Sequence, residues 1–138
     1  MHPYTHPQTA GRRVGSALTA TGLVAGALLL AAGTASAKSG ASVSVSSHSL
    51  RLGQSVHVTG SGGDDAARQT YLCVDQRTSA TGWRQLSCSP RPYQSVSTDV
   101  RASQRGAEQF RTRLLARHST GGPLVLDRVS GAVTVVVH

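Results

Sequence analysis

The chain has 138 residues, a formal net charge of +8 and only 4% aromatic residues. It carries no recognisable catalytic, nucleotide-binding or metal-binding motif, and its few aromatic side chains argue against stacking on nucleic-acid bases. Once its N-terminal segment is set aside, a chain of this length holds one domain with a modest core.

The first 37 residues have the parts of a secretory signal peptide. Arg12 and Arg13 supply positive charge, positions 14–37 carry no charge, and the apolar stretch LVAGALLLAA precedes Ala35-Ser36-Ala37. A positive start, a short apolar core and small residues at the cleavage site define such a signal. The dense apolar core of about ten residues is shorter than the roughly twenty that span a bilayer. A retained membrane anchor is the weaker alternative.

The residues after the two arginines favour the general secretory (Sec) route over the twin-arginine (Tat) route, because Val14-Gly15-Ser16 matches the Tat signal poorly. No cysteine follows the apolar stretch to carry a lipid, and neither a hydrophobic C-terminal tail nor a wall-sorting motif occurs. We therefore expect residues 1–37 to be removed. Residues 38–138 are then secreted as one domain that makes no membrane contact.

The predicted secreted part is basic, with Lys38 and eleven arginines against six acidic residues, a net charge of +6. Arginine replaces lysine almost entirely, and alanine, glycine and valine are abundant, which indicates the coding bias of a high-GC actinobacterium. That bias accounts for part of the basic charge without any binding role. A solvated cationic surface is therefore the plain interpretation beside a functional one.

Period-two alternation of apolar and polar residues runs through the predicted domain and indicates β-strands. It starts at Val43 and Val45, after a frayed segment at 38–41, and continues to Val58. The glycine-rich segment 60–65 then predicts a turn.

The rest of the domain follows the same pattern. Asp64–Gln69 is expected to form a helical turn, 101–106 an exposed loop, and Gly121-Gly122-Pro123 the turn into the last pair of strands. Further strands are expected at 70–75, 82–87, 95–100, 108–114, 124–129 and 132–137. Short strands at this spacing predict an all-β fold, an antiparallel β-sandwich of about seven strands.

The two cysteines, Cys73 and Cys88, lie on the hairpin expected from 70–75 and 82–87. In an oxidising compartment, two cysteines with none left over predict one disulfide. A metal-binding or reactive thiol pair is the alternative, but no supporting ligand lies near them in the sequence.

Several segments resemble the immunoglobulin-like sandwich domains common in secreted actinobacterial proteins. They are LGQSVHVTGSG at 52–62, Trp83 with Leu86, Phe110 on a strand, and the terminal SGAVTVVV. The resemblance covers most of residues 41–138 and implies an immunoglobulin-like fold.

A narrower similarity is to the neocarzinostatin-type apoproteins, secreted seven-stranded sandwiches that carry an enediyne in a cleft. It rests on the GQSVHVTGSG segment and on the cysteine pair that brackets one hairpin. The chain departs from that family because it lacks a second, shorter disulfide, spaces its cysteines further apart, and is basic where the family is typically acidic. The similarity implies the fold and, as a hypothesis, a small-molecule site beside the disulfide.

Strand parity places two apolar side chains beside that disulfide. Residues two apart in a strand share a face, so Tyr71 lies with Cys73, and Leu86 with Cys88. We expect this face to form a patch that contacts a small molecule, with Tyr93 near its rim. A bulge in the hairpin, or loops that cover the patch, would remove it.

The opposite face of the hairpin carries Leu72, Val74 and Trp83. Because this face holds the tryptophan, we expect it to pack into the core.

An arginine-rich segment follows, in which residues 101–117 contain five arginines and one acidic residue. The arginines are Arg101, Arg105, Arg111, Arg113 and Arg117. A surface strip of this sign attracts anionic polymers such as teichoic acids, acidic polysaccharides or nucleic acid. Sequence-specific binding of nucleic acid is not expected, since no reading helix accompanies the charge. Charged edge strands also deter aggregation of sheets, which is the plain interpretation.

The remaining polar residues predict no metal site, no cofactor and no enzyme. His48, His57, His118 and His138 are scattered, whereas zinc needs three or four ligands to converge. Asp64-Asp65 offers part of a calcium loop, but an ordinary turn is the simpler interpretation. No serine sits in a Gly-x-Ser-x-Gly setting, and no matched pair of acids could run acid–base chemistry.

These observations predict a secreted, non-enzymatic binding or interaction domain that contacts anionic cell-wall or extracellular polymers. Two alternatives stay open. One is a small-molecule carrier of the neocarzinostatin kind that uses the patch at Tyr71 and Leu86. The other is an inhibitor of secreted proteases that presents the loop Ser89–Tyr93.

Overall fold

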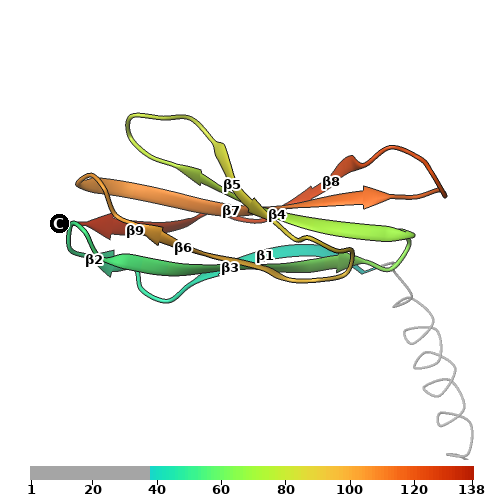
Figure 1. Cartoon of the computed structure of the whole chain (residues 1–138), viewed down its shortest axis with the longest axis horizontal. Helices are drawn as coiled ribbons and strands as arrows, with labels where there is room; N and C mark the ends of the chain where they lie inside the picture. The colour runs from blue at the N-terminus through green and yellow to red at the C-terminus, as the bar shows by residue number, and fades with distance from the viewer. Residues whose placement is uncertain (1–37) are drawn as a thin grey trace, which may run out of the picture. The chain divides into compact units, whose positions relative to one another are not determined.

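The computed structural model describes residues 38–138, whose arrangement is shown in Figure 1. The predicted signal peptide, residues 1–37, lies outside the described residues, so its cleavage and the export route stay predictions. Among the described residues, no helix has the length and apolar character needed to cross a membrane.

The described residues form nine β-strands and no helix, which confirms the all-β prediction. In chain order these are β1 (Ser39–Val45), β2 (Ser49–Leu50), β3 (Ser55–Asp64), β4 (Gln69–Arg77), β5 (Arg84–Cys88), β6 (Val96–Arg101), β7 (Gly106–Arg117), β8 (Val125–Val129) and β9 (Val133–Val137). The count exceeds the expected seven partly because the N-terminal segment is divided into β1 and the two-residue β2.

The strands lie in two layers (Figure 1). One sheet has the order β1-β3-β6, and the other has the order β2-β9-β7-β4-β5, with β8 also paired to β7. Immunoglobulin domains place strands A, B and E in one sheet and G, F, C and C′ in the other. Here β1, β3 and β6 occupy the first set of places, and β9, β7, β4 and β5 the second. The chain is therefore an immunoglobulin-like β-sandwich.

Strand β3 is longer than the sequence pattern predicted. The glycine-rich segment expected to turn instead continues the ladder, with Gly60 opposite Val43 and Gly62 opposite Ala41. A Cβ at Gly62, where φ is +153°, would lie 2.3 Å from the carbonyl oxygen of Gly40. Gly62 therefore allows a close approach of β3 to β1, and the segment does not change direction.

The segment between β3 and β4, predicted as a helical turn, is a tight turn. Asp64 Oδ1 accepts a hydrogen bond from Ala66 N at 2.8 Å, and the carbonyl oxygen of Asp64 accepts one from Ala67 N at 3.2 Å. An aspartate side chain that bonds the backbone two residues ahead favours a turn over a helix.

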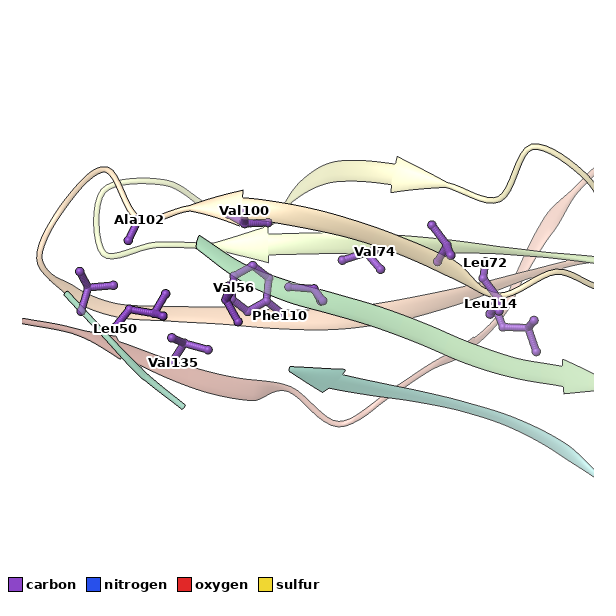
Figure 2. Close-up of a cluster of buried hydrophobic side chains, with 12 residues drawn as sticks. Leu50, Val56, Leu72, Val74, Val100, Ala102, Phe110, Leu114 and Val135 are labelled. Carbon is purple, nitrogen blue, oxygen red and sulfur yellow. The ribbon is translucent and has the colours of Figure 1, made fainter. Parts of the chain in front are cut away.

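The hydrophobic core lies between the two sheets (Figure 2). Its buried members are Leu50, Val56, Val58, Leu72, Val74, Val96, Val100, Ala102, Phe110, Leu114, Val135 and Val137. Figure 2 shows Leu72 next to Leu114, its register partner on β7. The burial of Leu72 and Val74 confirms that this side of β4 faces inward.

The inner face also holds a buried acidic residue, Glu108. Glu108 Oε2 accepts a hydrogen bond from Gln76 Nε2 at 2.9 Å, and Gln76 Oε1 accepts one from Arg84 Nη2 at 2.6 Å. The buried carboxylate is thus linked through an amide to an exposed arginine. This network gives a carboxylate oxygen buried inside the sandwich a hydrogen-bond partner.

Replacing Gly60 by alanine is expected to lower the free energy of unfolding by about 1–3 kcal/mol. The new Cβ would lie 2.6 Å from Thr112 Oγ1 and 3.0 Å from Val96 Cγ1, in the packed space between the sheets. Gly63→Ala is the matched control, since nothing lies within 4 Å of its Cβ position. Denaturant unfolding of both variants measures the difference, and equal stabilities would contradict this account of the packing.

Candidate functional site

The outer face of the six-stranded sheet carries an ion-pair cluster centred on Asp75 of β4. Asp75 Oδ2 accepts hydrogen bonds from Arg111 Nε at 3.1 Å and from Arg113 Nε at 2.7 Å. Only 2% of Asp75 is exposed. Arg113 also donates from Nη2 to Gln85 Oε1 at 2.8 Å. Two of the arginines predicted to attract a polymer are therefore committed to a carboxylate of the same sheet.

Trp83 belongs to this outer cluster and not to the core. The guanidinium carbon of Arg111 lies 4.2 Å from the centroid of the Trp83 ring, and that of Arg77 lies 5.4 Å away. These distances are those of cation–π contacts. The prediction that the tryptophan packs inward is wrong, because the ring is held by arginine side chains of the outer face.

The prediction that Leu86 lies on the same face as Tyr71 and the disulfide is also wrong. The ladder between β4 and β5 shifts register at Val74/Asp75, so that Val74 lies opposite Ser87 and Asp75 opposite Gln85. The extra residue on β5 is Leu86, which packs against the core. A bulge reverses the side-chain alternation on one strand. The apolar patch predicted from Tyr71 and Leu86 therefore does not form.

The predicted disulfide between Cys73 and Cys88 is present. The two cysteines are register partners across the β4–β5 hairpin, and Cys73 is buried. The bond lies at the end of β5 that adjoins the following loop. It joins this edge strand covalently to its neighbour β4.

The loop after β5 continues along β4 and presents Tyr93. Leu72 O accepts from Ser89 N at 2.8 Å, and Thr70 O accepts from Tyr93 N at 2.8 Å. Tyr93 is 64% exposed and has a φ of +62°, which is uncommon for a residue other than glycine. Tyr71, by contrast, is half-buried on its strand. The two tyrosines therefore differ in their availability to a partner.

The five arginines of the predicted strip are spread over several places. Arg101 ends β6 in the three-stranded sheet, and Arg105 is exposed in the loop before β7. Arg111 and Arg113 pair with Asp75, and Arg117 lies at the far end of β7. They do not form one continuous strip, because β6 and β7 belong to different sheets.

Arg117 instead lines a cavity of about 470 Å³ at one end of the sandwich. Its walls are Arg68, Gln69, Arg117, Ser119, Thr120 and Gly121. These residues come from the turn before β4, the start of β4, and the segment that follows β7. Loops at the ends of an immunoglobulin sandwich are a common position for binding sites.

Internal hydrogen bonds hold the arginines of this cavity in place. Arg117 donates from Nη1 to Gln69 Oε1 at 3.0 Å, and Arg68 donates from Nη1 to Thr120 Oγ1. Their backbones are joined by Arg68 N to Arg117 O at 2.9 Å. Among the described residues, neither arginine forms an ion pair with a carboxylate.

One polar atom of Arg117 lacks a partner among the described residues. Arg117 Nε is buried and has no hydrogen-bond acceptor among the described residues. A buried donor without an acceptor is destabilising, particularly on a charged group. The cavity suits an anionic ligand for a separate reason, because such a ligand would accept from the guanidinium groups that line it and from the hydroxyls of Ser119 and Thr120.

The sequence identified Arg117 but missed Arg68 and the 119–121 segment. These residues are polar, sit in turns, and carry no motif, so no local signal distinguishes them from ordinary loop residues. Their convergence follows from the pairing of β4 with β7, which sets Gln69 opposite Arg117.

A second group of polar residues gathers among the described residues, although the sequence predicted no metal site. Asp64, His118 and Asp127 each bring one ligand atom within 4.8 Å of the others. The sequence prediction treated His118 as a scattered histidine and Asp64 as part of a turn with Asp65, whereas the fold brings both next to Asp127.

Comparison with known proteins yields similar structures and no family. No family model and no curated protein matches the chain. The structure is similar to a β-glucosidase from Listeria innocua in complex with glucose, with 16% identity and a TM-score of 0.40 over 72% of this chain. The matched region is 16% of the β-glucosidase chain.

It is also similar to the CARDB domain of a Pyrococcus furiosus protein in complex with di-metal ions. The identity is 15% and the TM-score 0.38, over 75% of this chain and 97% of that domain. With TM-scores below 0.5, neither similarity assigns a function to any residue of this chain.

Proposed function

We propose that this chain is an extracellular, non-catalytic binding domain that recognises anionic groups on cell-wall or other extracellular polymers through the cavity of Arg68 and Arg117. The observation that carries the proposal is that Arg68 and Arg117 both line a cavity of about 470 Å³ and form no ion pair with a carboxylate of the described residues. A phosphate, sulfate or carboxylate oxygen in the cavity would accept hydrogen bonds from these guanidinium groups.

Charge supports the same proposal. The predicted secreted part has a net charge of +6, which attracts a polyanion to the surface before any specific contact is made. Arg111 and Arg113 share the single carboxylate of Asp75, whereas Arg68 and Arg117 have no carboxylate partner among the described residues. The unpaired arginines are thus the better candidates for ligand contact.

Teichoic acid binding provides the test. Arg117→Gln is expected to weaken binding of purified polyglycerolphosphate by about 10–100-fold, the loss that corresponds to one or more charge-assisted hydrogen bonds. Arg101→Gln is the matched control, because it removes the same charge from an exposed position in the other sheet. Its expected loss is no more than about 3-fold, through the general field alone.

Fluorescence anisotropy with labelled polymer, repeated at several salt concentrations, measures the dissociation constant of each variant. Equal losses in the two variants would mean that the polymer senses only net charge, and the cavity would then have no specific role. No binding by the unmodified protein would refute the proposal outright. Unchanged thermal unfolding of Arg117→Gln ensures that a loss of binding is not a loss of fold.

The geometry favours neither alternative. The carrier hypothesis needs Tyr71 and Leu86 on one face, but Leu86 packs against the core. The inhibitor hypothesis needs the Ser89–Tyr93 loop to offer its backbone to an enzyme, but the backbone N–H groups of Ser89 and Tyr93 already bond β4. The anion-binding proposal has in its support a cavity lined by two arginines that form no ion pair with a carboxylate of the described residues.

A further inference from the structure

Three segments that are far apart in sequence bring metal-ligating side chains together at one place. Asp64 ends β3, His118 follows the last residue of β7, and Asp127 lies within β8. One oxygen of each carboxylate and one imidazole nitrogen lie within 4.8 Å of one another. The group combines two hard oxygen donors with a nitrogen donor.

The carboxylates of this group lack a cation. Asp64 is 8% exposed, and its side chain accepts a single hydrogen bond, from Ala66 N. No lysine or arginine of the described residues forms an ion pair with Asp64 or Asp127, although this part of the chain contains twelve basic side chains. A buried carboxylate is ordinarily paired or coordinated to a metal. Two neighbouring carboxylates without a cation also repel each other.

The surroundings orient one of the ligands. Ser39 Oγ donates to Asp127 Oδ2 at 2.6 Å and accepts from Arg128 Nε at 3.2 Å. Hydrogen bonds of this kind to a ligating carboxylate hold it in position around a metal. His118, in contrast, is exposed and its ring makes no hydrogen bond to a described residue, so it is free to rotate onto an ion.

We propose that Asp64, His118 and Asp127 bind one divalent transition-metal ion, with zinc as the best fit, and that Ser39 positions Asp127. Imidazole with carboxylates suits zinc and its neighbours, whereas calcium and magnesium take oxygen ligands alone. Ligands about 2.0–2.2 Å from zinc lie roughly 3–3.5 Å from one another. Separations of up to 4.8 Å therefore need to shorten by an ångström or so, through rotation of the exposed His118 and small shifts of the two carboxylates.

The site is built for three protein ligands and an open position. A fourth ligand, water or an anion, completes the coordination of the ion. This site shares no lining residue with the cavity of Arg68 and Arg117, and it does not depend on the proposed function.

Zinc titration of the purified full chain tests the site in the absence of any polymer. A His2→Gln, His6→Gln background prevents these two histidines from competing for the ion. Calorimetry is expected to give one zinc per chain with a micromolar or tighter Kd, and a roughly hundredfold excess over Kd raises Tm by about 10 °C, since the ion binds the folded state alone. Substituted cobalt is expected to show the visible absorption of a low-symmetry site with nitrogen and oxygen ligands.

Single substitutions distinguish this site from weak surface binding. His118→Gln is expected to weaken zinc binding by about 100-fold or more, and Ser39→Ala by about 10-fold, the usual effect of removing a hydrogen bond to a ligand. His57→Gln is the matched control, because His57 is an exposed histidine that contacts a different carboxylate, that of Asp99, at 2.8 Å.

His118→Gln alters an exposed side chain and is expected to leave Tm in chelator unchanged. Two outcomes overturn the proposal. One is no saturable zinc binding by the background protein. The other is equal weakening in the His118 and His57 variants, which would mean adventitious surface binding only.

Discussion

Replacing Asp75 by asparagine is expected to lower the free energy of unfolding by about 2–3 kcal/mol. Asp75 Oδ2 holds both Arg111 and Arg113, so the substitution leaves two guanidinium groups on the sheet without their counter-ion. Removing one partner of a buried ion pair costs about 3–5 kcal/mol. The expected loss lies at or below the lower end of this range because about a quarter of each arginine side chain reaches solvent.

Thermal and denaturant unfolding measure this loss, with a Tm expected to fall by roughly 10–20 °C for a domain of this size. Asp99→Asn is the control, because Asp99 forms an exposed pair with His57 and its loss is expected to cost no more than about 0.5 kcal/mol. A similar, small effect at both positions would show that the outer cluster contributes little to stability.

The same substitution also tests whether Arg111 and Arg113 contribute to polymer binding alongside Arg68 and Arg117. Asp75→Asn releases Arg111 and Arg113 and raises the net charge by one unit. Polymer binding through the cavity is expected to be unchanged or slightly stronger, since Arg68 and Arg117 are untouched. A large gain would instead indicate that the β7 arginines make their own polymer contacts once Asp75 no longer holds them.

Replacing Cys73 and Cys88 together by alanine is expected to lower the free energy of unfolding by about 3 kcal/mol. The bond closes a loop of 15 residues, and its loss frees the unfolded chain more than the folded one. Strand β5 pairs only with β4 in its sheet, so it has no second neighbour that would hold it in place. The variant is expected to unfold at a Tm roughly 12–24 °C lower.

Reduction of the unmodified protein gives an independent measure of the same quantity. The reduced protein and the double-alanine variant are expected to have similar stabilities. Native-state hydrogen exchange is expected to show the loss first in β5 and the loop that follows it, because local opening begins where a strand has one neighbour. An unchanged Tm after complete reduction would contradict the stabilising role of the bond.

The strands themselves were predictable because their pattern is local. Alternation of apolar and polar residues requires only that one face of a strand be buried, and neighbouring residues reveal it. The hairpin of β4 and β5 and the disulfide on it followed from residues close together in the chain. The inward face of Leu72 and Val74 was expected because Trp83 was placed on it, and that reason was wrong.

The wrong predictions concern segments where the chain departs from the regular alternation of apolar and polar residues. The bulge at Leu86 inserts one residue into β5, and a single inserted residue turns the side chains beyond it to the other face. Leu86 and Trp83 exchanged their predicted sides for this reason. The segment 60–65 was predicted as a turn because glycine is common in turns, whereas here Gly62 lets β3 lie close against β1.

By itself, the amino-acid sequence determined the fold class, the cysteine pair and the excess of positive charge, since each follows from composition or from short-range pattern. Only the tertiary structure decided which charges are free. It paired Arg111 and Arg113 with Asp75, left Arg117 beside Arg68 in a cavity, and set His118 next to Asp64 and Asp127. The physical reason is that strand pairing joins residues distant in the chain, and a side chain's charge acts through what lies near it in space.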